Sequence, residues 1–238
     1  MTALTMDYVF PPAAPASLAV DGSTTRFPIA RVFCIGRNYR WQPDEPAPTR
    51  MPAWFMKPAT AVVPAQGTLP YPPGTAEFCH EVELVVAIGD GGRDIDPALA
   101  ASHIWGYAVG LDMTRRDLQQ QAKRAGDPWE PSKAFDHSAP CGPIVPVATC
   151  GHPHAGSIRL AVNGVARQHD DLSGLLWPVP ELVAMLSRSV TLMPGDLIFT
   201  GTPVGVAALQ PGDVISASVS GIGELSMTVG PPPSASHP

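Results

Sequence analysis

Proline and glycine are so frequent in this chain that they exclude long regular elements. Proline supplies 29 residues and glycine 22, spread over the whole length. Proline lacks a main-chain donor and disfavours a helical conformation in the residue before it, and glycine weakens both helices and strands. Their share, 51 of 238 residues, stays below the ~25–30% at which disorder is the default interpretation. We therefore expect a folded protein with short strands, short helices and many turns.

Short apolar runs bounded by turn residues recur along the chain and are typical of buried strands. They cover residues 32–36, 60–63, 82–88, 107–112, 158–162, 197–200, 214–218 and 225–229. Helix signals are fewer, and they open at Asp96, Thr114 and Pro180. The segments that follow these signals end near residues 103, 126 and 187. The pattern predicts a mainly β fold with a few short helices, in the α+β class.

The chain divides into three parts by composition. Residues 1–30 are rich in proline, alanine, serine and threonine, which predicts an N-terminal arm or small hairpin. Residues 31–230 form one catalytic domain in this interpretation, and residues 231–238 have the composition of a disordered tail. Within the domain, the four prolines between residues 42 and 52 favour a surface loop or lid over 40–52 rather than a long helix.

Charge and hydropathy exclude several classes of partner. The formal net charge is -6 and no run of lysines and arginines occurs, which argues against a nucleic acid or an anionic membrane as partner. Nowhere do about 18 consecutive apolar residues occur, and the first ten residues lack the basic and apolar regions of a signal peptide. The four cysteines have no Cys-x-x-Cys spacing and indicate reduced thiols. We expect a cytoplasmic protein.

Two carboxylates stand at the start of the most apolar predicted strand. Glu81 and Glu83 are two residues apart, so on a strand they share one face at a spacing of about 7 Å. The strand is apolar on both faces beyond them, which predicts burial, and two buried carboxylates repel each other unless a cation lies between them. A divalent ion is the simplest explanation. The alternative is a strand end that projects into water.

Asp112 ends another apolar run and is positioned to supply a third ligand. Three carboxylates without a nearby Cys–His pair form an oxygen-only site, which favours Mg²⁺, Mn²⁺ or Ca²⁺ over zinc. Asp112 also has a structural interpretation, as an acidic residue near a helix N-terminus that the helix dipole favours. The spacing of the residues does not separate the two.

A series of motifs follows one after another along residues 31–229. The motifs are Phe33-Cys34-Ile35-Gly36-Arg37-Asn38-Tyr39, Phe55-Met56-Lys57-Pro58, His80-Glu81-Val82-Glu83-Leu84, Leu111 to Gln119, Lys133-Ala134-Phe135-Asp136, Val162-Asn163-Gly164 and Pro194 to Val206. In this order they resemble the fumarylacetoacetate hydrolase family, and within it most closely the short bacterial acylpyruvate hydrolases, those of fumarylpyruvate among them. So many ordered motifs are far more specific than any single one.

The resemblance implies a mixed β-sandwich roll, of the type of the family's C-terminal domain, and a homodimer. It also implies that Glu81, Glu83 and Asp112 bind Mg²⁺ or Mn²⁺, while Ca²⁺ fits the same oxygens in a crystal. Lys133 would be the catalytic lysine, whose ammonium stabilises negative charge on a substrate oxygen, although most lysines lie on the surface. The positions that surround the substrate in relatives are here Arg37, Tyr39, Arg116, Gln119 and Thr202. Arginine suits a carboxylate through its paired donors, and a solvated Arg116 is the alternative.

The implied reaction is cleavage of a carbon–carbon bond in an acylpyruvate, a 2,4-diketo acid such as fumarylpyruvate. Such a small oxo acid chelates the ion through its carboxylate and 2-oxo group, and the ion withdraws charge from the enolate that forms. A base must also make hydroxide from water, which attacks the acyl carbonyl and releases pyruvate and a second acid.

The base is where this chain departs from the family pattern. Hydrolytic relatives carry a histidine and, three residues later, a glutamate, where this chain has Gln42 and Glu45. Gln42 cannot take a proton, and Pro43 and Pro46 oppose a helix that would direct Glu45 inward. One interpretation is that Glu45 serves as the base alone. Another is decarboxylation or tautomerisation of a small oxo acid such as oxaloacetate, and a third is a metal-binding or diketo-acid-binding protein with little catalysis.

Overall fold

The structure is a computed structural model that describes residues 7–40 and 50–232. Its strands are β1 (Ser17–Ala19), β2 (Arg26–Pro28), β3 (Val32–Ile35), β4 (Trp54–Lys57), β5 (Val62–Pro64), β6 (Thr68–Leu69), β7 (Phe78–Cys79), β8 (Val82–Ile88), β9 (Ile104–Leu111), β10 (Thr114–Arg115), β11 (Ala139–Cys141), β12 (Val145–Pro146), β13 (Ser157–Val162), β14 (Val165–Asp171), β15 (Leu197–Phe199), β16 (Val214–Val219) and β17 (Gly223–Val229). Its helices are α1 (Arg116–Ala125), α2 (Glu130–Lys133), α3 (Val147–Cys150) and α4 (Val179–Ser189), with 3-10 turns η1 (Ala59–Ala61), η2 (Pro97–His103) and η3 (Leu172–Gly174).

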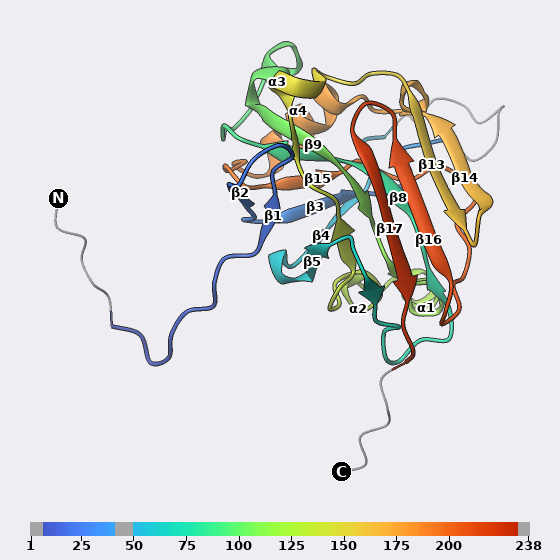
Figure 1. Ribbon diagram of the computed structural model, residues 1–238. Helices are drawn as coiled ribbons and strands as arrows, with labels where there is room; N and C mark the ends of the chain where they lie inside the picture. The colour runs from blue at the N-terminus through green and yellow to red at the C-terminus, as the bar shows by residue number, and fades with distance from the viewer. Residues whose placement is uncertain (1–6, 41–49, 233–238) are drawn as a thin grey trace.

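Two sheets form most of the molecule (Figure 1). The larger is mixed, with the order β4-β3-β15-β8-β9-β11-β5 and β12 beside β9; β15 runs parallel to β3 and antiparallel to β8. The smaller has the order β14-β13-β16-β17-β6. Contacts of β13 with β8 and of β17 with β9 join the two sheets. The prediction of a mainly β fold with a few short helices is confirmed.

Strand β8 separates two apolar clusters because its side chains alternate between the two faces of the larger sheet. Val82, Leu84, Val86 and Ile88 belong to the cluster shared with the smaller sheet. Val85 and Ala87 point the other way, into a cluster that the β1–β2 hairpin covers with Leu18 and Phe27. Glu81 and Glu83 share the parity of Val85 and Ala87. They therefore lie where this second face of β8 begins.

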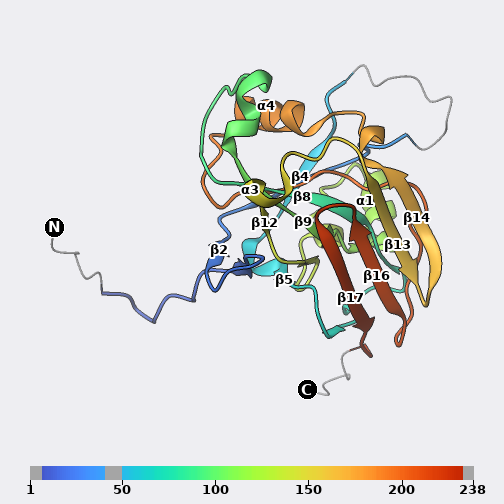
Figure 2. The same ribbon diagram turned by 45° about the horizontal axis from the view of Figure 1, so that its top comes forward.

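The helices gather at the two ends of the sheets. In Figure 1, α3 and α4 lie at one end, and α1 and α2 lie at the other, near the first residues of β8; Figure 2 turns the end that carries α4 toward the viewer. Helix α2 contacts α1, β4 and β10. None of the helices in the described ranges is long and apolar enough to cross a membrane.

The helix predicted to have Thr114 as its N-cap instead starts at Arg116, one residue later than expected. Thr114 and Arg115 pair with β7 as strand β10, and the Thr114 hydroxyl donates to the main-chain oxygen of Asp112 instead of capping a helix. Strand pairing has overridden a capping-type sequence pattern here. The other end agrees with the prediction, because Gly126 adopts a left-handed φ of 76° that glycine accepts at no steric cost.

Candidate metal centre

Three carboxylates, those of Glu81, Glu83 and Asp112, come together where β8 begins and β9 ends. The antiparallel ladder pairs Val82 with Leu111, and the main-chain N–H of Asp112 donates to Glu81 O at 2.8 Å. One oxygen of each carboxylate lies within 4.8 Å of an oxygen of the other two. Glu83 and Asp112 are each 1% exposed and Glu81 is 7% exposed, so this acidic trio is shielded from water.

Two buried lysines face the acidic trio. Lys133, at the end of α2, donates from Nζ to Glu81 Oε2 at 2.8 Å and to Asp112 Oδ2 at 2.7 Å. Lys57, on β4, places Nζ 2.9 Å from Asp112 Oδ1 and donates to the main-chain oxygens of Met113 and Lys133. Both side chains are buried. The surface-lysine alternative for Lys133 is therefore wrong, and Lys57 is a site residue that the sequence analysis did not single out.

The ion pairs shift the pKa values of the groups that form them. Burial alone would raise the pKa of Asp112, but the Lys133 and Lys57 ammonium groups hold it below its ordinary value. Burial alone would lower the pKa of Lys133, but the charges of Asp112 and Glu81 raise it above its ordinary value. Both groups are therefore charged at neutral pH.

Glu83 differs from the other two carboxylates because no ion pair reaches it from the described residues. Its Oε2 accepts one hydrogen bond, from the main-chain N–H of Gly201 at 2.8 Å. Burial and the charges of Asp112 and Glu81 raise the pKa of Glu83 well above its ordinary value. A buried carboxylate with no ion-pair partner among the described residues, next to two other carboxylates, fits a divalent cation. The all-oxygen donor set suits Mg²⁺ or Mn²⁺.

Helix α1 adds two of the predicted substrate-binding residues. Arg116 donates from one terminal nitrogen to Glu81 Oε1 at 2.5 Å and from the other to Gln119 Oε1 at 2.5 Å. The Arg116 side chain is 18% exposed and Gln119 is buried. The solvated alternative for Arg116 is therefore wrong, because its guanidinium lies against the acidic trio.

The remaining predicted residues have different surroundings. The Thr202 hydroxyl donates at 2.8 Å to the main-chain oxygen of Val82, the residue between Glu81 and Glu83. Tyr39 is buried, and its hydroxyl has no hydrogen-bond partner in the described part of the chain. Arg37 is exposed and holds a left-handed φ of 56°, which is unusual for a residue with a side chain. Gln42 and Glu45 lie outside the described residues.

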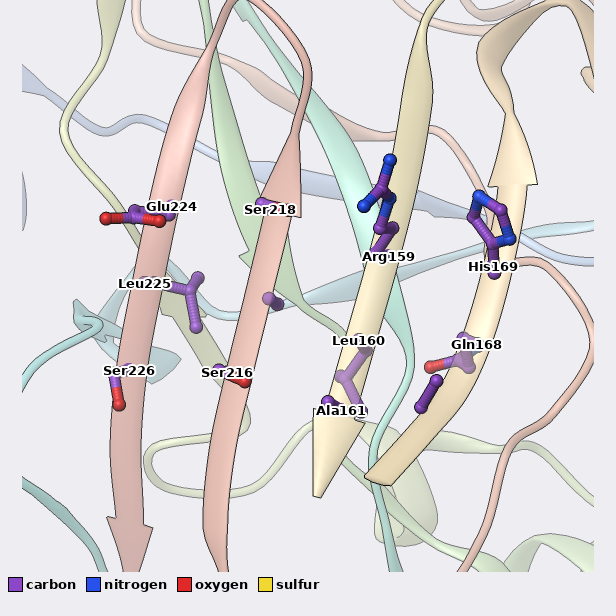
Figure 3. A pocket seen from close by; sticks show the side chains of 12 residues that line it. Arg159, Leu160, Ala161, Gln168, His169, Ser216, Ser218, Glu224, Leu225 and Ser226 are labelled. Atoms are coloured by element: carbon purple, nitrogen blue, oxygen red, sulfur yellow. The ribbon is translucent and has the colours of Figure 1, made fainter. Parts of the chain in front are cut away.

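The acidic trio lies outside the hollow that the described chain forms over its smaller sheet. That hollow, of about 710 Å³, lies over the smaller sheet and is lined by residues of β13, β14, β16 and β17 (Figure 3). None of the three carboxylates lines it. The site is recognised by its chemistry and burial and not by the size of its cavity.

Known proteins resemble the chain over nearly its whole length. The family model described as fumarylacetoacetate (FAA) hydrolase C-terminal matches residues 31–230. A fumarylpyruvate hydrolase of Ralstonia sp is 44% identical over 178 residues, which is 75% of this chain and 92% of the relative. An oxaloacetate tautomerase of Rattus norvegicus is 38% identical over 193 residues, 80% of this chain and 87% of the relative.

A solved structure agrees with these relatives. The crystal structure of a fumarylpyruvate hydrolase from Pseudomonas aeruginosa, in complex with Mn²⁺ and pyruvate, superposes with a TM-score of 0.90 at 47% identity. It covers 94% of this chain and 99% of the crystallised chain. Together with the ordered motifs, these matches confirm the resemblance stated from the sequence: the chain belongs to the fumarylacetoacetate hydrolase family.

Proposed function

We propose that the protein is a metal-dependent hydrolase that cleaves the carbon–carbon bond of an acylpyruvate such as fumarylpyruvate, giving pyruvate and a second acid. The observation that carries the proposal is the buried acidic trio with Lys133 against it, in a chain 47% identical to a fumarylpyruvate hydrolase that binds Mn²⁺ and pyruvate. In the same proposal, the protein works as a homodimer.

Glu81, Glu83 and Asp112 would hold Mg²⁺ or Mn²⁺ in this proposal. The ion would act as a Lewis acid toward the oxygens of the oxo acid and favour its enolate form. The site's own charges support an anionic substrate, because the three carboxylates are balanced by Lys57, Lys133 and Arg116. A divalent ion then leaves the site with two positive charges in excess, which an oxo-acid anion offsets.

Each neighbouring cation has a role in the proposed reaction. The Lys133 ammonium, which spans Glu81 and Asp112, donates hydrogen bonds to a substrate oxygen as negative charge develops on it. Arg116, with its side chain 18% exposed, presents paired donors that suit a substrate carboxylate. Lys57 pairs with Asp112 and donates to the main-chain oxygen of Lys133, so it holds Asp112 and the end of α2 in place.

Tautomerisation of oxaloacetate is the second candidate for the same site. It is favoured by the 38% identity to an oxaloacetate tautomerase and by Gln42, which stands where hydrolytic relatives carry a histidine. Tautomerisation moves one proton and needs no attack by water, so it does not require a base that makes hydroxide. Decarboxylation of oxaloacetate likewise needs no attack by water.

A substrate panel separates these reactions. The Mn²⁺-loaded protein is incubated with fumarylpyruvate and with the enol form of oxaloacetate, and the diketone absorbance, the enol absorbance, pyruvate and carbon dioxide are followed. We expect fumarylpyruvate to be lost with one pyruvate formed per molecule, at a turnover on the order of 1–100 s⁻¹. Loss of the enol absorbance alone would favour the tautomerase. Formation of pyruvate and carbon dioxide from oxaloacetate would favour the decarboxylase. Turnover of neither substrate would contradict the proposed enzyme.

A further inference from the structure

One buried glutamine links the two sheets beside the acidic trio. Gln168 lies on β14, at the edge of the smaller sheet, and is 1% exposed (Figure 3). Its Oε1 accepts from the main-chain N–H of Val82 at 3.1 Å and lies 2.9 Å from His80 Nδ1. Its Nε2 donates to the Thr202 hydroxyl at 2.8 Å and to Pro203 O at 2.7 Å. The amide thus uses both its donors and both its acceptor positions.

Main-chain partners fix the orientation of this amide. The Val82 N–H can only donate, so it requires Gln168 Oε1, and Pro203 O can only accept, so it requires Gln168 Nε2. Since Oε1 cannot donate, His80 must carry its proton on Nδ1. His80 Nε2 is then unprotonated, in accord with its having no hydrogen-bond partner in the described ranges.

The same reasoning fixes the Thr202 hydroxyl. Its proton is committed to Val82 O at 2.8 Å, because a carbonyl oxygen only accepts, and its oxygen accepts from Gln168 Nε2. A substrate carboxylate also only accepts, so it cannot take this proton unless the bond to Val82 is broken. The Thr202 hydroxyl is therefore an anchor that ties its loop to β8.

A second contact holds the loop that contains Thr202 against β14. A Cβ at Gly205 would overlap the main-chain oxygen of Arg167, so the loop backbone lies directly on the strand that bears Gln168. The loop also supplies the N–H of Gly201 to Glu83. Gln168 and the Gly205 contact together set where Gly201 and Thr202 stand relative to the carboxylates.

We propose that Gln168 is a positioning residue that holds Thr202 and its loop in the arrangement that binds the oxo acid. The inference rests on the proposed function, since it takes an oxo acid as the ligand of this site. Gln168 forms no hydrogen bond with the carboxylates or the lysines of the described chain, and Thr202 is the loop side chain to which it bonds. Metal binding depends instead on the acidic trio and on the Gly201 bond to Glu83, which Gln168 does not make.

Pyruvate affinity and Mn²⁺ affinity should therefore separate in variants. Calorimetry first measures Mn²⁺ binding and then pyruvate binding to the Mn²⁺-loaded protein. We expect Gln168→Leu and Thr202→Val each to weaken pyruvate binding about tenfold, the effect of one lost hydrogen bond, while Mn²⁺ affinity changes less than about threefold. The double variant should be no weaker than either single one, because both remove the same link.

Thr200→Val is the matched control. Thr200 is buried and its hydroxyl also donates to a β8 carbonyl, Leu84 O at 2.9 Å, but it has no bond to Gln168. In the double variant Thr200→Val/Gln168→Leu, the fold-change in pyruvate affinity should equal the product of the fold-changes of the two single variants. Gln168→Glu guards against misfolding of the leucine variant, because it keeps the shape and the acceptors but, when ionised, loses the donor to Thr202. It should show the same tenfold loss.

The imidazole ¹⁵N spectrum of His80 gives a readout that needs neither metal nor turnover. In the wild-type protein and in Thr200→Val we expect the Nδ1-protonated form, and in Gln168→Leu a shift toward a mixture of the two tautomers. Unchanged pyruvate affinity in folded Gln168→Leu, or multiplying effects of Gln168→Leu and Thr202→Val, would overturn the inference. Wild-type protein that binds pyruvate but turns over no acylpyruvate would contradict only the proposed reaction. Wild-type protein that binds no pyruvate would contradict both proposals.

Discussion

Lys133→Met should lower kcat by about 10²–10³-fold on the best oxo acid of the substrate panel, because it removes the ammonium that we propose stabilises the developing charge. Methionine has a similar length and suits the apolar side of the site, where Lys133 Nζ lies 5.1 Å from the centre of the Phe55 ring. The measurement is steady-state kinetics of the Mn²⁺-loaded variant.

The same variant should keep or gain Mn²⁺ affinity. Lys133 occupies one oxygen each of Glu81 and Asp112, so its ammonium competes with a cation for them. Lys123→Met is the matched control, since Lys123 is the one lysine of the sequence besides Lys57 and Lys133 and is exposed on α1. We expect it to behave as wild type. A Lys133→Met enzyme with kcat within about threefold of wild type would show that Lys133 stabilises no developing charge.

Glu83→Gln should weaken Mn²⁺ binding by at least about 100-fold, since even residues that only support a metal ligand are worth about 10–100-fold. Glutamine preserves the size of the side chain and the oxygen that accepts from Gly201, so the loss reports the charge alone. Calorimetric titration of the metal-free protein with Mn²⁺ measures it.

Proton release gives a second test of Glu83. Because burial and its acidic neighbours raise the pKa of Glu83, the carboxyl is protonated up to a higher pH than usual and must lose its proton to bind a cation. Mn²⁺ affinity of the wild type should therefore fall as pH falls, with proton uptake by the buffer. Titrations in buffers of different ionisation heat measure this release, which Glu83→Gln should lack.

The control for this pair of tests is Glu224→Gln. Glu224 is an exposed glutamate on β17, far along the chain from the trio. It should leave Mn²⁺ affinity and proton release unchanged. Retained stoichiometric Mn²⁺ binding in Glu83→Gln would remove Glu83 from the metal site.

The sequence predicted the parts of this site that depend on local periodicity. Alternation along β8 placed Glu81 and Glu83 on one face, and the apolar run before Asp112 placed that residue at a strand end. Pairing of β8 with β9 then brings the two ends together, as neighbouring strands in a chain often do. The roles of the lysines came only with the family resemblance, and for Lys57 not at all, because its site contacts join β4 to residues more than fifty positions away.

Gln168 shows why the remainder could not be predicted. Strand β14 is an edge strand with mostly polar and charged residues, so it lacks the apolar run that identifies a buried strand, and no segment there was predicted as β. Which of its polar residues turns inward depends on the register with β13, including an irregularity at Leu160 and Ala161. That register exists only in the folded sheet.

The most direct test of the proposed metal site is a crystal of the protein grown with Mn²⁺ and pyruvate, examined by anomalous diffraction at the manganese edge. We predict one strong peak at about 2.0–2.3 Å from oxygens of Glu81, Glu83 and Asp112, with pyruvate on the same ion. A peak elsewhere, with the three carboxylates still bonded only to Lys57, Lys133, Arg116 and Gly201, would contradict it.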